Sequence, residues 1–474
     1  MIESVIYLSP IVSLLLGIAV LAVCSWQKIS SSWVFRWTKI FVAASFGFSI
    51  IFYNRSAFPD YMHTDKFSAV FGGLMYVFAG LTLFLSRKWY AGMNLSGTLF
   101  CAVLMMALVA GEILLVSRNF WVTAGGIALI LLSNYLMFLR ADKKKNVEAS
   151  SRLYAGAALF MFALLVALVC LLFWENTDLS YDALSLYFEE NADNLTAFVL
   201  AAAMVLIFVF LLGLPPLHFW YTETTGQVVL PVFSYFTLVT SSVYAAAFIR
   251  LNAQVFSAIS PKLELFYQGL AILALFAGAL GACSGKNIRK IFAYGTVYQL
   301  GIILLLMQRL TPSAVNLAFV YLVIFLISMS GVCACLFSLK NKGEYLFMLN
   351  DFSGMAFKRP FVAAALTFFL FSLSGFPPFL GFWSFFAAAA DLVQHNNFYQ
   401  LALWLAALLI LTYAYLQIIK TLYFENSQIT FDKADRGVYF IIVLILGTMM
   451  VLTSQPYFLL QNFQEMLESV LIWQ

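Results

Sequence analysis

The sequence predicts an all-α integral membrane protein with about fourteen transmembrane helices. Three observations indicate this fold class. Of the 474 residues, 63% are hydrophobic and only 10% are charged. The apolar runs reach the roughly 20 residues that a helix needs to cross a bilayer. No polar stretch is long enough for a soluble domain, so we expect a single polytopic domain over residues 1–474.

The predicted spans follow one another along the whole chain. They lie at residues 4–25, 38–53, 67–86, 95–117, 120–139, 153–174, 195–220, 228–250, 265–285, 291–308, 314–338, 360–393, 400–424 and 437–455. The first has no basic n-region and no small-residue cleavage site, so it is expected to be a retained span and not a signal peptide. Over residues 454–474 apolar residues recur at helical spacing, which predicts an amphipathic helix on the outer membrane surface or against a partner subunit.

Basic residues are concentrated on one side of this arrangement. If the N-terminus lies outside, the loops that face the cytoplasm, with their flanks, hold 20 of the 26 lysines and arginines. The loop from Glu175 to Asp193 carries six acidic residues and no basic one, as an external loop can. The positive-inside rule therefore predicts that both termini lie on the outer side of a bacterial inner membrane. In such a protein a net charge of +4 gives no reason to expect a nucleic acid as partner.

Two predicted spans are each interrupted by a pair of prolines. One contains "GLPPLHFW" at 213–220, and the other contains "GFPPFLGFW" at 375–383. Proline lacks an N–H donor and clashes with the preceding turn of a helix, so both spans are expected to be broken there. The breaking residues are Pro215, Pro216, Pro377 and Pro378. Within a bilayer such a break is tolerated only where neighbours or a polar cavity satisfy the freed carbonyls.

The two broken spans are the seventh and the twelfth, so they cross the membrane in opposite directions. This pattern indicates an inverted repeat with one broken helix in each half. The halves are expected at 95–250 and 265–424, after N-terminal helices at 1–94 and before a last helix and tail at 437–474. Two ordinary proline kinks, which are common in membrane helices, are the alternative interpretation.

The sequence shows no signature of metal, disulfide or redox chemistry. All six cysteines fall within predicted spans without a CxxC spacing, and the three histidines are far apart in the sequence. Cysteines of this kind are expected to pack as small apolar residues. A Gly-rich dinucleotide-binding loop is also missing from the sequence, so we expect no metal and no cofactor to be bound by this chain.

Several longer motifs resemble one family, the antiporter-like subunits of proton-pumping NADH:quinone oxidoreductase (respiratory complex I), and subunit N in particular. The similar stretches are "NVEASSRLY" at 146–154, "LPPLHFW" at 214–220, "GALGACSGKNIRKIFAYGTVYQLG" at 278–301, "DFSGMAFKRP" at 351–360, "SLSGFPPFLGF" at 372–382 and "YAYLQIIKTLYF" at 413–424. They cover nearly the whole chain from about Gly111 onward. The resemblance implies a proton-transporting membrane subunit of a respiratory-chain translocase, with the other membrane subunits and the bilayer as its partners.

The resemblance also implies four ionisable side chains at mid-membrane, and this sequence departs from the family there. The family's fifth-helix Glu and its seventh-, eighth- and twelfth-helix Lys fall on Ala128, Leu211, Ser241 and Phe385. A charge at the bilayer centre costs on the order of 3 kcal/mol or more and persists only when function retains it. Loss of four charges with both breaks kept suggests a scaffold that is preserved and a proton path that is dismantled.

The polar residues that remain in or near the spans are candidates for a rerouted ion path. They are Glu112, His218, Glu223, Ser241 and Gln299. Glu112 is either a replacement acid or an interfacial residue that reaches the outer surface or pairs with Arg118. His218 either links the path to the cytoplasm or caps freed carbonyls. Glu223 stands where the family has an Asp and is either functional or a structural anchor. Gln299 replaces a histidine common in the family's tenth helix.

Three hypotheses on function follow. The first is a subunit N homologue of NADH:quinone oxidoreductase that is retained for assembly and packing and moves few or no protons itself. The second is a working subunit that pumps by a path through Glu112, His218 and Gln299. The third is a subunit of another assembly with the same module, such as a multisubunit cation/proton antiporter or a membrane hydrogenase. None of them places a redox active site in this chain.

Overall fold

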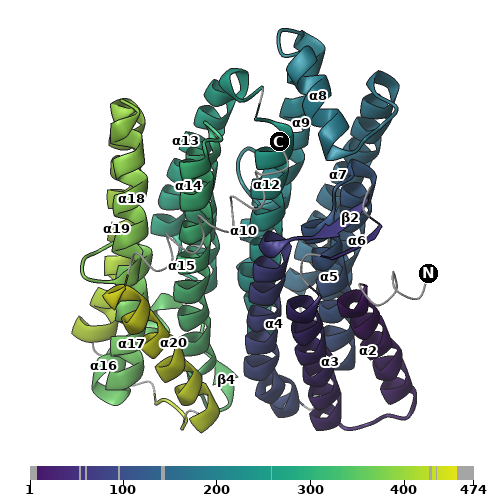
Figure 1. The fold of residues 1–474 in the computed structure, drawn as a ribbon. Coiled ribbons are helices and arrows are strands. Elements are labelled where there is room, and N and C mark those ends of the chain that lie inside the picture. The colour runs from purple at the N-terminus through teal and green to yellow at the C-terminus, as the bar shows by residue number, and fades with distance from the viewer. Residues whose placement is uncertain are drawn as a thin grey trace. The chain divides into compact units, whose positions relative to one another are not determined.

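The chain is almost entirely helical. The computed structural model describes residues 8–52, 55–58, 61–93, 95, 97–139, 145–257, 259–425, 430–433 and 435–455. Within these residues twelve helices are long and apolar enough to cross a membrane (Figure 1). Three shorter apolar helices adjoin the two Pro-Pro pairs: Leu195–Leu211, Pro360–Leu373 and Leu380–Gln394. The prediction of an all-α, multi-pass membrane protein is confirmed.

The described residues form two compact units. The first unit comprises the described parts of Met1–Leu212 and Leu238–Leu263, and the second comprises those of Gly213–Thr237 and Glu264–Gln464. The chain therefore leaves the first unit just before the first Pro-Pro pair. It returns within the π-helical turn η1(Tyr235–Thr240) and leaves again near the start of α13(Ser260–Ser284).

The first unit is built around helix α5. Its helices are α2(Ser9–Trp26), α3(Ser31–Ile51), α4(Lys66–Gly92), α5(Thr98–Val116), α6(Phe120–Leu139), α7(Lys145–Glu175), α8(Tyr181–Glu190), α9(Leu195–Leu211) and α12(Ser241–Val255). Helices α2, α3, α4, α6 and α12 all pack against α5, which is largely buried. Helices α2, α3 and α7 bury a third of their spans or less, so most of their apolar surface is left for lipid or partner helices.

One end of the first unit is covered by a hairpin and a short helix. Strands β1(Arg55–Phe58) and β2(Met62–Thr64) pair antiparallel. The turn between α5 and α6 lies between this hairpin and the segment before α8, because the Arg118 N–H donates to the Tyr61 carbonyl and the Arg118 carbonyl accepts from Tyr181. Helix α8 is amphipathic and packs on α12, with Phe188 edge-on to Phe256.

The second unit is built around helix α15. Its elements are α10(Phe219–Thr225), α11(Leu230–Ser234), α13(Ser260–Ser284), α14(Ile288–Met307), α15(Pro312–Phe337), β3(Lys340–Asn341), β4(Glu344–Tyr345), η2(Leu349–Phe352), α16(Met355–Lys358), α17(Pro360–Leu373), α18(Leu380–Gln394), α19(Phe398–Phe424) and α20(Arg436–Ser454). Helix α15 is almost fully buried and contacts α11, α14, α17, α18 and α20. Strands β3 and β4 form a two-residue antiparallel hairpin.

Both Pro-Pro pairs lie in non-helical segments with the same local geometry. The first segment separates α9 from α10, and the second separates α17 from α18. In each, a glycine two residues before the prolines, Gly213 or Gly375, has a φ of +67°, and the Pro-Pro peptide bond is cis. A positive φ is disfavoured for residues with a Cβ, which explains why glycine occupies this position in both motifs.

The predicted spans agree with the helices to within a few residues, with three differences. Helix α3 begins at Ser31 and not at 38, because its first two turns carry tryptophan and basic residues that lower the mean hydropathy. Helix α7 begins at Lys145 and not at 153. Helix α8 was missed, since it is short, amphipathic and part of the acidic loop. The predicted amphipathic helix over 454–474 falls, from residue 456 onward, outside the described residues.

Candidate functional site

Glu112 is held inside the first unit by a tyrosine. Its side chain is 3% exposed, and the Tyr76 hydroxyl of α4 donates to Glu112 Oε2 at 3.0 Å. Gly72 of α4 leaves room for the carboxyl group, because a Cβ at that position would lie 3.2 Å from Oε2. Among the described residues Glu112 has no ion-pair partner, so the predicted pairing with Arg118 is not found there.

Glu112 also lines a small cavity. The cavity measures about 20 Å³ and is bounded by the ends of α2 and α3, by β2 and by α5. Its polar lining includes Ser49 and Thr64, and its apolar lining includes Pro10 and Phe48. A volume of this size holds about one water molecule. Glu112 therefore combines a buried acid, a hydroxyl donor and space for hydration.

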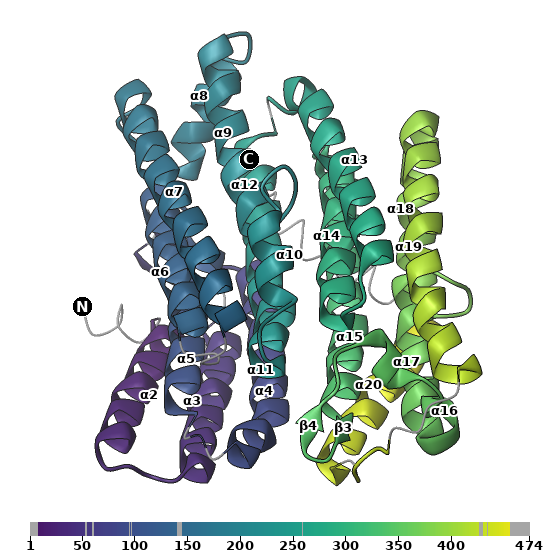
Figure 2. The ribbon, with the colours of Figure 1, turned by 180° about the vertical axis from the view of Figure 1, so that it is seen from behind.

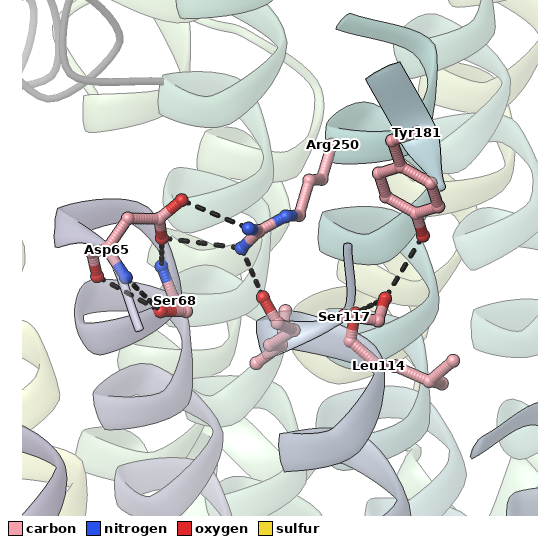
Figure 3. Close-up of polar contacts among 7 residues, drawn as sticks. Asp65, Ser68, Leu114, Ser117, Tyr181 and Arg250 are labelled. Carbon is pink, nitrogen blue, oxygen red and sulfur yellow. Dashed lines mark hydrogen bonds and ion pairs between the residues drawn. The ribbon is translucent and has the colours of Figure 1, made fainter. Parts of the chain in front are cut away.

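A buried ion pair, which the sequence did not suggest, lies near the covered end of the first unit (Figure 3). Arg250 of α12 bonds to Asp65 with Nη2–Oδ2 and Nη1–Oδ1 distances of 3.1 and 3.3 Å, and its Nη1 also donates to the Leu115 carbonyl. Both side chains are almost fully buried. Asp65 in addition caps α4, because the Ser68 N–H donates to Oδ1 at 2.8 Å. The ion pair thus ties α4, α5 and α12 together, because the carboxylate caps α4 and the guanidinium of α12 bonds to α5.

Around this pair further polar groups connect the covering segments. Figure 3 shows Tyr181, the first residue of α8, directed at Ser117 at the end of α5, with 3.0 Å between the two hydroxyl oxygens. His63 of β2 is half-buried in the same region. Its burial and the nearby charges of Arg118 and Arg250 lower the pKa of His63, while Asp65 acts in the opposite direction.

The three first-unit positions where the family has charges lie on three different helices. Ser241 is buried and follows the π-helical turn at the start of α12. Leu211 is buried at the end of α9. Ala128 lies instead on a groove between α6 and α7, which run side by side in Figure 2, and the groove is lined by apolar residues such as Leu132 and Leu159. The Glu112 carboxyl group itself bonds to Tyr76 and lies beside Gly72, and both of these residues belong to α4.

In the second unit, the sequence "NIRK" at 287–290 holds the segment after the first break. Asn287 donates to the Gly226 carbonyl at 3.2 Å and caps α14, and Arg289 donates to the Val228 carbonyl and stacks on the Phe347 ring. Lys290 pairs with Glu223 of α10 at 2.5 Å. Three of these four residues, Asn287, Arg289 and Lys290, therefore bind α10 and the connection that follows it, and Glu223 is held in place by one of them.

His218 lies directly before α10, between the first break and that helix. Its carbonyl accepts from the N–H groups of Tyr221 and Thr222, and its ring has a backbone hydrogen bond at Pro216, within the break. The ring is stacked near Phe219 and faces Tyr294 of α14 edge-on at 6.2 Å between centroids. His218 and Glu223 are therefore both positioned against α14.

Gln299 of α14 satisfies a carbonyl that the second break releases. In an unbroken helix the Leu373 carbonyl would accept from residue 377, but Pro377 has no N–H. The Gln299 side-chain amide donates to that carbonyl at 2.7 Å, and the Tyr321 hydroxyl of α15 donates to Gln299 Oε1. The NH2 group and the carbonyl oxygen of this neutral amide are thus both hydrogen-bonded, and the freed Leu373 carbonyl has a partner without a charged side chain.

Ser372 makes hydrogen bonds on the other side of the same break. Its hydroxyl accepts from the Gly381 N–H of α18 at 3.1 Å and lies 2.9 Å from the hydroxyl of Ser328 on α15. The first N–H groups of a helix have no partner within that helix, and this contact satisfies one of them for α18. The twelfth-span break is therefore bonded by uncharged side chains on α14, α15 and α17.

Phe385 fills the space next to this break. The ring stacks on Trp404 of α19 at 5.6 Å between centroids, contacts the ring of Tyr321 at 5.5 Å, and is 7% exposed. It also packs against Gly375, where a Cβ would lie 2.7 Å from the ring. The structure thus brings Phe385 and Gln299 together through Tyr321, a residue that sequence reasoning did not single out. No group of three His, Cys, Asp or Glu side chains that could hold a metal occurs among the described residues.

Comparison with known proteins agrees with this architecture. A family described as "NADH:quinone oxidoreductase/Mrp antiporter, TM" matches residues 117–412, which is more than half of the chain and includes both breaks. The chain belongs to this family. A similar relative is NADH-quinone oxidoreductase subunit N of Paramagnetospirillum magneticum, 24% identical over 407 residues that cover 84% of this chain and 82% of the relative.

The fold of this antiporter-family chain recurs in solved membrane complexes. A chain of respiratory complex I from Thermus thermophilus superposes with a TM-score of 0.80 and 18% identity, covering 95% of this chain and 98% of the other. A chain of the Mrp complex from Dietzia sp. superposes with a TM-score of 0.86 and 15% identity, covering 99% and 98%. At these identities the likeness establishes the fold alone, and it does not separate the two kinds of complex.

Proposed function

We propose that this chain is a subunit N-like subunit of the membrane arm of a NADH:quinone oxidoreductase, with a structural and assembly role and no proton path through its second unit. Its relatives named subunit N and the resemblance of its motifs support the assembly. The observation that carries the role is the break at Pro377: its freed carbonyl bonds to the neutral Gln299, and Phe385 packs where the family has a lysine.

The proposal includes a full topology. Twelve long helices plus two broken spans, α9 with α10 and α17 with α18, make fourteen spans. Both breaks share a glycine of φ +67°, which supports an inverted repeat. The positive charges support termini on the outer side of a bacterial inner membrane, with the other membrane subunits and lipid as neighbours.

The test is the proton stoichiometry of the intact complex, reconstituted into vesicles. We expect fewer protons per electron pair than in a complex whose antiporter-like subunits all carry buried charges. We also expect Phe385→Leu to leave the ratio unchanged, because an apolar residue is replaced by another in the aromatic cluster. A lower ratio for Phe385→Leu at normal assembly would contradict the structural role.

A rerouted pump is the second candidate, and one observation favours it. Glu112 is a buried acid without a cation, next to a hydroxyl and a cavity for about one water. Such an acid is a reasonable proton carrier. Glu112→Gln decides between the two candidates, with Tyr76→Phe as the companion variant. An unchanged proton ratio supports the structural role, whereas a drop in both variants supports the rerouted path.

The remaining alternative, a multisubunit cation/proton antiporter or membrane hydrogenase, is tested by purification. The tagged chain is extracted in mild detergent and its partners are identified by mass spectrometry. Recovery with NADH-oxidising and quinone-reducing subunits supports the proposal. Recovery with antiporter subunits and no redox protein, or with hydrogenase subunits, would assign the chain to one of these other complexes.

A further inference from the structure

One end of the first unit carries positive charge that no nearby sequence balances. The end of α2, the start of α3 and the end of α4 meet there, and the basic residues include Lys28, Arg36, Lys39 and Arg87. Between Ser4 and Pro59 the sequence has no acidic residue, and none follows Asp65 until Glu112. Asp65 itself caps the opposite end of α4.

Two of these cations are held close together. Lys39 on α3 lies over the Phe84 ring of α4 with 4.9 Å from Nζ to the ring centroid, and Arg87 follows Phe84 by one turn of α4. No ion pair of Lys39, Arg87 or Arg36 is present among the described residues. Like charges brought together in this way are stabilised by an anion between them.

The outer face of α3 shows which kind of anion fits. Trp33, Arg36, Trp37 and Ile40 recur at helical spacing and so lie on one face. Trp33 and Ile40 are 50% and 55% exposed, and the Arg36 guanidinium lies 4.9 Å from the Trp33 ring centroid. Aromatic and basic residues thus occupy the first turns of the helix, and an aliphatic residue follows them.

This order matches the cross-section of a bilayer leaflet. Tryptophan is enriched at the level of the headgroups, and basic side chains extend from helix ends toward phosphates. Trp26, at the end of α2, is 87% exposed, and Val23, one turn further into α2, is 49% exposed. The α2–α3 pair therefore presents tryptophan and basic side chains to a lipid headgroup and aliphatic side chains to its acyl chains.

We propose that the α2–α3 end binds an anionic phospholipid, with the headgroup phosphate between Arg36, Lys39 and Arg87 and the acyl chains along Val23 and Ile40. A soluble phosphate would use the cations but would leave the exposed tryptophans and aliphatic residues without a role. The proposed orientation of the chain places this site in the cytoplasmic leaflet. The proposal does not depend on whether the subunit moves protons.

The test compares lipids on the purified full-length protein in detergent, by native mass spectrometry and thermal unfolding. Phosphatidylglycerol should remain bound and raise the melting temperature more than phosphatidylcholine. In the double variant Arg36→Gln/Lys39→Gln, the affinity for phosphatidylglycerol should fall about thirty-fold. Each basic residue near the membrane surface contributes a factor of about five to this affinity. Lys66→Gln, at the opposite end of α4, is the matched control and should retain wild-type affinity.

Arg36→Gln alone, at an exposed position where folding is not at stake, should show part of the same loss. Equal retention of both lipids by the wild type would overturn the proposal, as would unchanged phosphatidylglycerol binding in the double variant. Soluble glycerophosphate is the third ligand whose effect on the melting temperature is measured. A melting-temperature increase with it that equals the increase with lipid would show a site for small phosphates and overturn the assignment to lipid.

Discussion

At the scale of single residues, Gln299 shows how a neutral group replaces an ionisable one. The position is a histidine in much of the family that the sequence resembles. Here the amide accepts from Tyr321 and donates to the Leu373 carbonyl, so both of its polar ends are used. A histidine in the neutral form has one donor and one acceptor with a different separation. The glutamine is therefore fitted to this break, and the bond network explains its presence without a role in titration.

Removing that amide should destabilise the second unit. Gln299→Leu leaves the Leu373 carbonyl buried without a partner, which costs about 1–3 kcal/mol. Unfolding of the purified protein in mixed detergent should show this loss, whereas Gln417→Leu on the half-exposed side of α19 should not. Equal stability of the two variants would mean that another group takes over the carbonyl.

His63 should make stability depend on pH. Its pKa in the folded protein lies below the ordinary value of 6.5, first because of burial and then because of Arg118. The unfolded chain therefore binds more protons between the two pKa values, so stability rises with pH in that window. The contribution of His63 to the free energy of unfolding is fully present above about pH 6.5, and it is lost as the pH falls through the lowered pKa of the folded protein.

The measurement is the melting temperature of wild type and His63→Gln between pH 5 and pH 8. The decrease of the wild-type melting temperature toward pH 5 should be smaller in the variant. Parallel curves for wild type, His63→Gln and His63→Asn would show that other groups determine the slope.

At the scale of elements, the positions of the spans could be predicted because lipid requires apolar runs of bilayer length. Helix α8 could not, since a short amphipathic helix with acidic residues looks like a loop in a hydropathy profile. The site was predictable in part. The resemblance selected Gln299 and Phe385, but Tyr321, which joins them, is one of many aromatic residues in an apolar span and carries no signal of its own. The groove that Ala128 faces depends on the packing of α6 on α7, which no local pattern specifies.

The second break depends on Gly375. With φ at +67° and the Phe385 ring where a Cβ would lie, Gly375→Ala should cost at least about 1–2 kcal/mol from the backbone alone. Gly447→Ala, in open space on α20 of the same unit, is the control and should be neutral or slightly stabilising. Assembly of the complex should fall in the first variant only, as measured by the amount of intact complex in native gels.

At the scale of the whole molecule, the orientation of the helices in the membrane can be tested directly. A single cysteine introduced at Lys286 should react with a membrane-impermeant reagent only from the cytoplasm, and one at Asp182 only from outside. The six native cysteines are first replaced by serine or alanine. Reaction of the Lys286 position from outside would reverse the orientation and with it the leaflet assigned to the α2–α3 lipid site.

The buried pair of Asp65 and Arg250 bears on how the protein is made. Its two residues are 185 positions apart in the chain. At roughly 5–20 residues per second, a ribosome needs about 10–40 s to reach the second after the first. During that interval α4 stands in the bilayer with its carboxylate unpaired while α5 to α11 are still being synthesised. The first unit can therefore be completed only after part of the second has left the ribosome, and a chain truncated before α12 lacks the cation that Asp65 requires.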